Sequence, residues 1–361
     1  MRVRTLLLIL ALAGCGSGDD TPPTSPDAAP QPVDGVARPC ISTLAAGHLL
    51  PTAYDAAYIT YACQGGAQYE HLTIADGVLT GGDARGDVQE LAKRTVVLDT
   101  GESVESIAML EARSPFMWLW TDGDGMTIGS HSAFESVALA DVDGDHVRDL
   151  VVAGAGSIRA LASARLPNET WLATGKPFRF VAAVPEDDSK LFYVAADEGS
   201  FVELGVAQRI STMPPGYGDT ELELEAPATH LADVQPLVVA DIDGDGIADI
   251  CGALPRLFVR SSRYATTKFL DEQAAAVAAG DVTGDGVADL VFVTADRSAV
   301  RRVAFGTQSG NLVFASEPLL ADGGDAIAVG DLDGDKIADV LLLKDANTMA
   351  SRVVMHLATS Y

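Results

Sequence analysis

One nine-residue aspartate pattern occurs four times in this sequence, at residues 141–149, 241–249, 281–289 and 331–339. Every copy has Asp at positions 1, 5 and 9 and Gly at position 4, and three copies also have Asp at position 3. Carboxylates held this close together repel one another unless a cation lies between them. Because the ligands are oxygen atoms and several are charged, the pattern predicts Ca²⁺ in each loop. A repeated pattern also predicts a modular architecture.

Short apolar runs rich in Val and Ile lie on both sides of each loop, such as residues 137–140 before the first loop and 150–152 after it. Runs of this length, bounded by turn residues, are typical of buried strands. The unit is therefore strand, metal loop, strand. This excludes an EF-hand, whose loop ends at position 12 in a bidentate Glu and lies between helices. The residues at position 12 here are Val152, Gly252, Phe292 and Leu342.

The strand–loop–strand unit resembles the FG-GAP/VCBS repeat, the calcium-loop blade of integrin-type β-propellers. The resemblance is closest at Phe305-Gly306, then 310–314, then 327–343, in the order of phrases within one repeat. It implies an all-β fold, a closed β-propeller of four-stranded blades.

Weaker copies of the strand that precedes each loop begin at residues 56, 105 and 180, which gives seven units in all. The aligned positions in the seven strands are 57, 107, 137, 181, 237, 277 and 327. We therefore expect a seven-bladed propeller over residues 40–361, with six or eight blades as alternatives. The ring is expected to join residues 40–61 to residues 351–361, with a late strand at 352–357.

The resemblance implies that side chains at positions 1, 3, 5 and 9 and the carbonyl oxygen of position 7 bind about four structural Ca²⁺ ions. The implied ligands are Asp141, Asp143, Asp145, Val147 and Asp149; Asp241, Asp243, Asp245, Ile247 and Asp249; Asp281, Thr283, Asp285, Val287 and Asp289; and Asp331, Asp333, Asp335, Ile337 and Asp339. We expect the third site to be weaker, because Thr283 replaces a carboxylate, and the second to be the tightest. If position 6 requires a positive φ, His146 and Lys336 are strained.

The first 39 residues are expected to lie outside the propeller. Arg2 and Arg4 precede an apolar run, and Leu12-Ala-Gly14 before Cys15 resembles a bacterial lipobox. This implies a lipoprotein signal peptide at 1–14 and a lipidated Cys15, followed by a proline-rich flexible tether at 15–39. We expect the chain to be exported and anchored by lipid in the bacterial cell envelope, in the outer membrane or at the cell surface.

The net charge of −27 argues against nucleic acid or bare anionic lipid as a partner. Membrane contact is therefore expected only through the lipid anchor. In an oxidising envelope Cys40 and Cys63 could form a disulfide, or both could remain free thiols. Cys251 lies in an apolar run and is expected to be a small buried hydrophobic residue.

No arrangement of catalytic residues is evident in the sequence, since the six His residues lack metal-ligand spacing and no nucleophile elbow or phosphate loop is present. We therefore expect a binding, adhesion or scaffold module that presents one propeller face to a protein or glycan, and not an enzyme. Two alternatives remain: a polysaccharide lyase or hydrolase built on a propeller, and a subunit of an envelope complex with no ligand of its own.

Overall fold

The computed structural model describes strands, turns and loops between residues 31 and 358, and the strands account for most of that length. The described range has gaps at residues 49–54, 62–66, 76–77, 83–84, 89–91, 99–105, 112–115, 122–123, 130–133, 155, 162–169, 185–188, 198–200, 213–214, 228–236, 255, 263–265 and 309–310. Within these residues no helix is long and apolar enough to cross a membrane.

Four sheets contain the aspartate loops, each between the first and second strand. They comprise β11 (Ser136–Ala140), β12 (Asp149–Gly154), β13 (Ser157–Ala160) and β14 (Thr170–Thr174); β19 (Leu237–Ala240), β20 (Asp249–Leu254), β21 (Arg256–Ser261) and β22 (Thr266–Phe269); β23 (Ala274–Gly280), β24 (Asp289–Thr294), β25 (Val300–Gln308) and β26 (Asn311–Leu320); and β27 (Ala326–Gly330), β28 (Asp339–Lys344) and β29 (Arg352–Leu357) with β1 (Gln31–Ala37).

Three further sheets have no aspartate loop of this pattern. They comprise β2 (Ile41–His48), β3 (Asp55–Tyr61), β4 (Ala67–Ala75) and β5 (Val78–Gly81), with β6 (Arg85–Val88) also paired to β4; β7 (Ala92–Leu98), β8 (Ser106–Glu111), β9 (Phe116–Thr121) and β10 (Asp124–Gly129); and β15 (Phe178–Ala183), β16 (Lys190–Asp197), β17 (Phe201–Thr212) and β18 (Pro215–Pro227). Neighbouring strands within the sheets pair antiparallel.

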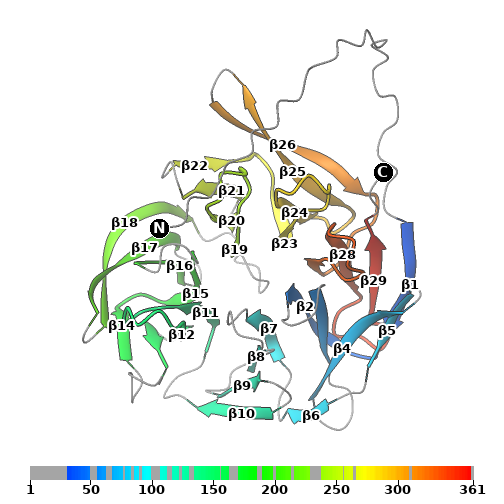
Figure 1. Ribbon diagram of the computed structural model, residues 1–361, viewed down its shortest axis with the longest axis horizontal. Coiled ribbons are helices and arrows are strands. Elements are labelled where there is room, and N and C mark those ends of the chain that lie inside the picture. The colour runs from blue at the N-terminus through cyan, green and yellow to red at the C-terminus, as the bar shows by residue number, and fades with distance from the viewer. Residues whose placement is uncertain are drawn as a thin grey trace, which may run out of the picture.

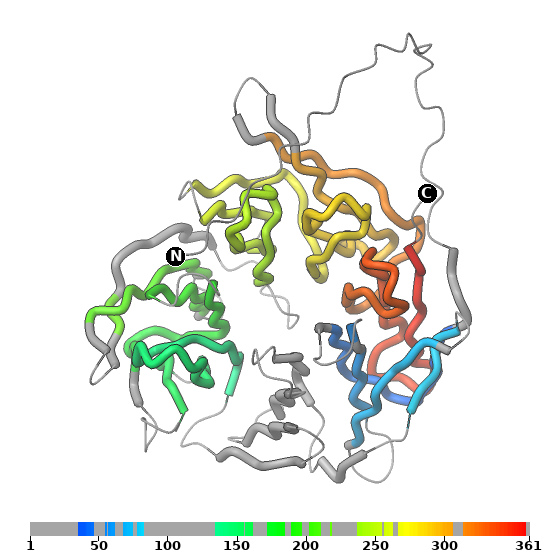
Figure 2. Tube along the Cα trace, in the orientation of Figure 1, coloured from blue at the N-terminus to red at the C-terminus, as the bar shows by residue number. Residues whose placement is uncertain are grey.

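The seven sheets formed by the described residues stand around a common centre, in the order of the chain (Figure 1). The strands nearest the centre contact one another in turn, from β2 through β7, β11, β15, β19 and β23 to β27. The last of them, β27, contacts the first, β2. In Figure 2 the early residues drawn in blue lie beside the late residues drawn in red. The fold is an all-β propeller.

The hydrophobic core lies between the sheets, and alternation along single strands explains its position. In β24, Leu290 and Phe292 pack toward the β19–β22 sheet, while Val291 and Val293 pack toward β27 and β28. All four side chains are at most 1% exposed. A strand buried on both faces is a continuous apolar run, which is why this stretch of the sequence shows no polar alternation.

The first strand, β1, completes the last sheet by pairing antiparallel with β29. Residues 31–37 were expected to belong to the flexible tether, so the folded region begins before residue 40 and that boundary is corrected. The run contains Pro32 and Gly35, which are unfavourable inside a sheet, but β1 is an edge strand, where a missing N–H donor is tolerated. The predicted late strand at 352–357 is confirmed as β29.

Ionic and backbone contacts hold this junction next to the following sheet. The guanidinium of Arg38, just after β1, donates to both carboxylate oxygens of Glu70 in β4, at 2.7 and 2.8 Å. Glu70 is 1% exposed, so the ion pair offsets part of the cost of burying its carboxylate. The N–H of Arg38 also donates to the carbonyl oxygen of Ser351, at 3.2 Å.

Two of the sequence alignments were wrong in detail. The strands that contain Ala57 and Ile107 were matched to the strand preceding each loop, which is the innermost strand of a sheet. In the structure these strands are β3 and β8, the second strands of their sheets, and β2 and β7 lie inside them. Without an aspartate loop to mark the first connection, one apolar strand cannot be told from the next by sequence pattern.

Candidate metal centre

All four aspartate loops occupy the same connection in their sheets, between the innermost strand and the second strand. In each case position 9 is the first residue of the second strand, as Asp249 is of β20 and Asp339 is of β28. Since the sheets share one strand order and stand around one centre, the loops lie on the same face of the ring.

The carboxylate at position 1 organises each turn by accepting backbone hydrogen bonds. In the first loop Asp141 accepts from the N–H groups of Gly144, Asp145 and His146, at 2.6, 3.0 and 2.8 Å. Positions 4 and 6 have positive φ in every loop, including 68° at His146 and 74° at Lys336. His146 and Lys336 are therefore strained, as predicted for a positive φ at position 6, because a left-handed backbone conformation disfavours a residue with a Cβ.

The carboxylate at position 9 is buried in all four loops, with between 0% and 7% of the residue exposed. Its Oδ2 accepts the N–H of position 2, at 3.0 to 3.2 Å. Burial raises the pKa of Asp249 to about 6, and the charge of Asp243 adds to the shift. Burial likewise raises the pKa of Asp339 to about 7. These sites therefore hold ionised carboxylates at a free-energy cost unless a cation compensates them.

Three of the loops bring their carboxylates together. Each residue in a group offers an oxygen within 4.8 Å of the others. The groups are Asp141, Asp143 and Asp149; Asp241, Asp243 and Asp249; and Asp331, Asp333 and Asp335. In the first group the Oδ2 of Asp143 is buried and has no hydrogen-bond partner among the described residues. An all-oxygen donor set with an unsatisfied buried carboxylate oxygen fits a hard divalent cation.

The third loop differs from the second and the fourth in its surroundings. Thr283 takes the place of the position 3 carboxylate and is exposed. The guanidinium of Arg302 in β25 lies against the position 9 carboxylate, with 3.1 Å between its Nη1 and the Oδ1 of Asp289. Sequence reasoning did not identify Arg302, because only the register of β25 on β24 places it beside the loop.

Neighbouring loops also contact one another across the sheets. The N–H of Ala288 donates to the carbonyl oxygen of Asp241 at 3.2 Å, and that of Ala338 donates to Asp281 at 2.7 Å. A Cβ on Gly284 would lie 2.9 Å from the Cδ1 of Ile337, the position 7 side chain of the next loop. The conformation of one loop therefore depends on the loop beside it.

The structure describes two of the four cysteines, Cys40 and Cys251. Cys40 is disulfide-bonded. The described residues contain only one other cysteine, Cys251, which is free and buried, so the partner of Cys40 lies outside them. Cys63 and Cys15 also lie outside the described residues, as does the predicted signal peptide. Burial raises the pKa of the Cys251 thiol well above its usual value, as expected for a small hydrophobic residue.

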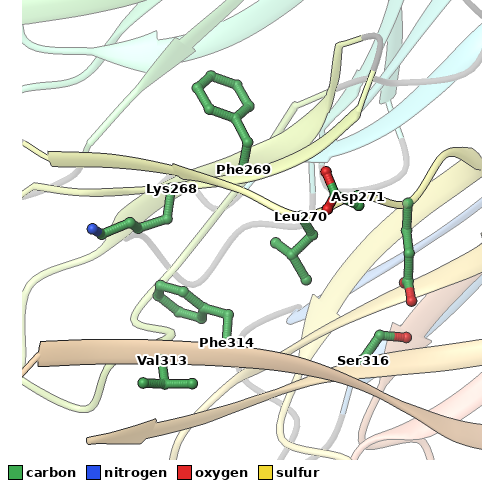
Figure 3. A pocket seen from close by; sticks show the side chains of 8 residues that line it. Lys268, Phe269, Leu270, Asp271, Val313, Phe314 and Ser316 are labelled. Atoms are coloured by element: carbon green, nitrogen blue, oxygen red, sulfur yellow. The ribbon is translucent and has the colours of Figure 1, made fainter. Parts of the chain in front are cut away.

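A groove of about 540 Å³ lies between the outer strands of two sheets, β22 and β26. Figure 3 shows Leu270 and Phe314 directed into it from opposite sides. Phe269 at its edge is 37% exposed, and Asp271 beside it forms an ion pair with Arg256 at 2.9 Å. The groove has apolar and charged walls, and none of its lining residues belongs to an aspartate loop.

Comparison with known proteins supports the repeat and the fold. Residues 281–342 match the model of the FG-GAP-like repeat, and they span the third and fourth aspartate loops. No curated protein sequence matches the chain. Among solved structures it is similar to BBS1N, crystallised in complex with ARL6DN and soaked with mercury, with 13% identity and a TM-score of 0.57 over 91% of this chain and 98% of that one.

A second similar structure is a protein from Lactobacillus plantarum, with 12% identity and a TM-score of 0.52 over 80% of this chain and 89% of that one. Both neighbours are β-propeller proteins, and at these identities the likeness concerns the fold alone. The chain therefore contains an FG-GAP-like repeat within a β-propeller.

Proposed function

We propose that this chain is a calcium-stabilised β-propeller that acts as an exported binding module for another protein. The observation that carries the calcium assignment is the carboxylate group found in three loops at one equivalent place in the fold. FG-GAP-like repeats are generally calcium-binding, which supports the same assignment for this chain. The role of the ion is structural, with no catalytic step assigned to it.

Calcium would stabilise the ring by offsetting repulsion among carboxylates that the fold buries. When bound, the ion supplies positive charge to side chains at positions 1, 3, 5 and 9. The chain holds these side chains through the backbone hydrogen bonds at positions 1 and 9. Because the carbonyl oxygen at position 1 also accepts bonds from the next sheet, ordering a loop stabilises the contact between sheets.

Calcium titration followed by thermal unfolding tests this assignment. We expect chelation to lower the Tm and added Ca²⁺ to restore it, because a ligand bound only by the folded state stabilises that state. Asp241→Ala should lower the Tm in calcium more than Thr283→Ala. Asp271→Ala removes an exposed carboxylate outside the loops and serves as the control. Identical melting curves with and without chelator would refute the calcium assignment.

A protein partner is supported by the structural neighbour that is in complex with a protein. In this proposal the partner binds the propeller face opposite the aspartate loops. Calcium-dependent co-purification of a defined protein partner from envelope extract, lost in Asp241→Ala, would support a binding module. Calcium-dependent retention on a glycan resin would instead identify a glycan ligand.

An enzyme or a passive subunit would give different results. Cleavage of uronic-acid polysaccharides by the purified chain would support a lyase. A fixed stoichiometric partner that is retained in chelator, with no separate ligand, would support a subunit of an envelope complex.

The lipid anchor is part of the same proposal. It rests on the small residues that precede Cys15. Replacement of Cys15 by Ala should move the protein from the membrane fraction to the soluble fraction and abolish incorporation of labelled fatty acid. Unchanged membrane association of this variant would refute lipid anchoring at Cys15.

A further inference from the structure

The third aspartate loop, residues 281–289, is surrounded differently from the second and the fourth. We propose that this loop holds no calcium and that the guanidinium of Arg302 supplies its positive charge instead. The inference rests on the proposed calcium function, since it distinguishes this loop from those that bind the ion. It assigns Arg302 a positioning role in the loop and gives the chain one calcium site fewer than its sequence repeats indicate.

Arg302 is built into the loop by contacts on both sides. Its Nη1 lies 3.1 Å from the Oδ1 of Asp289, and its Nη2 lies 2.8 Å from the Oε2 of Glu317 in β26. The side chains of Arg302 and Asp289 are 22% and 9% exposed. A charge-assisted pair in partly buried surroundings is held more firmly than an exposed one, because water screens it less.

In two other loops the same carboxylate oxygen has a neutral partner. The Oδ1 of Asp249 accepts the backbone N–H of Ser262 at 2.9 Å. The Oδ1 of Asp339 accepts the backbone N–H of Ala358 at 3.1 Å. A neutral donor leaves the carboxylate charge to be compensated by an ion, whereas the guanidinium at Asp289 offsets part of that charge directly.

The loop has also lost one of its acidic residues. Thr283 at position 3 is neutral, and the remaining carboxylates of this loop do not form one of the close oxygen groups found among the described residues. Thr283 removes one negative charge from the loop, and Arg302 brings a positive charge to the position 9 carboxylate while also pairing with Glu317. Both changes reduce the repulsion that a divalent ion would otherwise offset.

Equilibrium dialysis against labelled Ca²⁺, with the full chain, measures how many ions each variant binds. Asp245→Ala and Asp285→Ala remove the equivalent position 5 carboxylate from the second and third loops. We expect Asp245→Ala to lose about one ion per chain and Asp285→Ala to lose none. Loss of an ion in Asp285→Ala, with the other loops still binding, would overturn the inference alone. If the wild type binds no calcium, both this inference and the proposed function fail.

A second pair of variants tests the arginine directly. Arg302→Met should lower the Tm in calcium-free buffer. Arg301→Met is the matched control, because Arg301 lies on the same strand but contacts Ser316 and, at 3.9 Å, Glu272 instead of an aspartate loop; it should lower the Tm less. The double variant Thr283→Asp/Arg302→Met restores the acidic pattern and removes the guanidinium, so it should gain about one ion per chain. No gain in a variant that remains folded by circular dichroism would refute the assignment.

Discussion

The buried carboxylate of Asp339 makes the calcium-free protein less stable as the pH rises. Its pKa is raised from 3.8 to about 7, first by burial and then by the charges of Asp333 and Asp335. The folded protein therefore keeps a proton on Asp339 that the unfolded chain has already released. Between pH 3.8 and about 7 the unfolded state binds fewer protons, so the free energy of unfolding falls with pH and is constant above that range.

The size of the effect follows from the shift. Each pKa unit corresponds to about 1.4 kcal/mol, so Asp339 alone accounts for a loss of about 3 kcal/mol between pH 5 and pH 8. Asp339→Asn removes the titration and should abolish this part of the loss. The side-chain amide of the Asp339→Asn variant has one oxygen, so it can accept a hydrogen bond from only one of the two backbone N–H groups, Leu332 or Ala358, and places its own NH₂ group against the other. This lowers the free energy of unfolding by about 1–3 kcal/mol at both pH values. The difference between the two pH values is therefore the informative quantity.

Urea unfolding in calcium-free buffer at pH 5 and pH 8 measures this difference. Asp296→Asn is the control, since Asp296 is exposed and hydrogen bonds from Thr294 and Ser298 lower its pKa. Calcium at pH 8 should recover the stability that the wild type loses, and Asp339→Asn should recover less. If Asp339→Asn loses as much stability as the wild type between pH 5 and pH 8, the reasoning from burial is refuted.

Three further substitutions test the loops and the closure of the ring. Gly284→Ala should lower the free energy of unfolding by about 1–2 kcal/mol or more, because φ is +76° and the new Cβ would lie too close to Ile337. Denaturant titration measures this loss, and an unchanged free energy of unfolding would refute it. Lys336→Gly should raise the free energy of unfolding by about 0.5–1 kcal/mol and so raise the Tm slightly, because it removes left-handed strain at φ 74°. A lower Tm would contradict this. Arg38→Met should cost about 1–3 kcal/mol, because it removes the charged partner of the buried Glu70 carboxylate. Arg38→Met/Glu70→Leu should recover part of the loss, and equal stability of the two variants would refute that role of the pair.

The sequence predicted the loops well because their residues are constrained by local geometry. Aspartates and glycines at fixed spacing describe a turn and its flanking strands without reference to the rest of the chain. The apolar runs after each loop correspond to β12, β20, β24 and β28, and the all-β propeller follows from the repetition of this unit.

Features that depend on distant partners could not be predicted in the same way. The strand β1 is recognisable only through its pairing with β29, some 320 residues later, since its own sequence contains Pro32 and Gly35. The placement of Ala57 and Ile107 in second strands depends on which apolar run reaches the centre of the ring. Arg302 is not part of the aspartate pattern. It lies beside the third loop only because of the register in which β25 pairs with β24.

The pairing of β1 with β29 has a mechanical consequence. Tension applied to the chain ahead of Gln31 reaches the ring through the hydrogen bonds of this one outer strand, because β1 pairs with β29 alone among the strands that the structure describes. The register irregularity between Val33 and Val36 interrupts that row of bonds. Under load, β1 should therefore detach first, and the contacts of Arg38 with Glu70 and Ser351 then decide how far the rupture spreads.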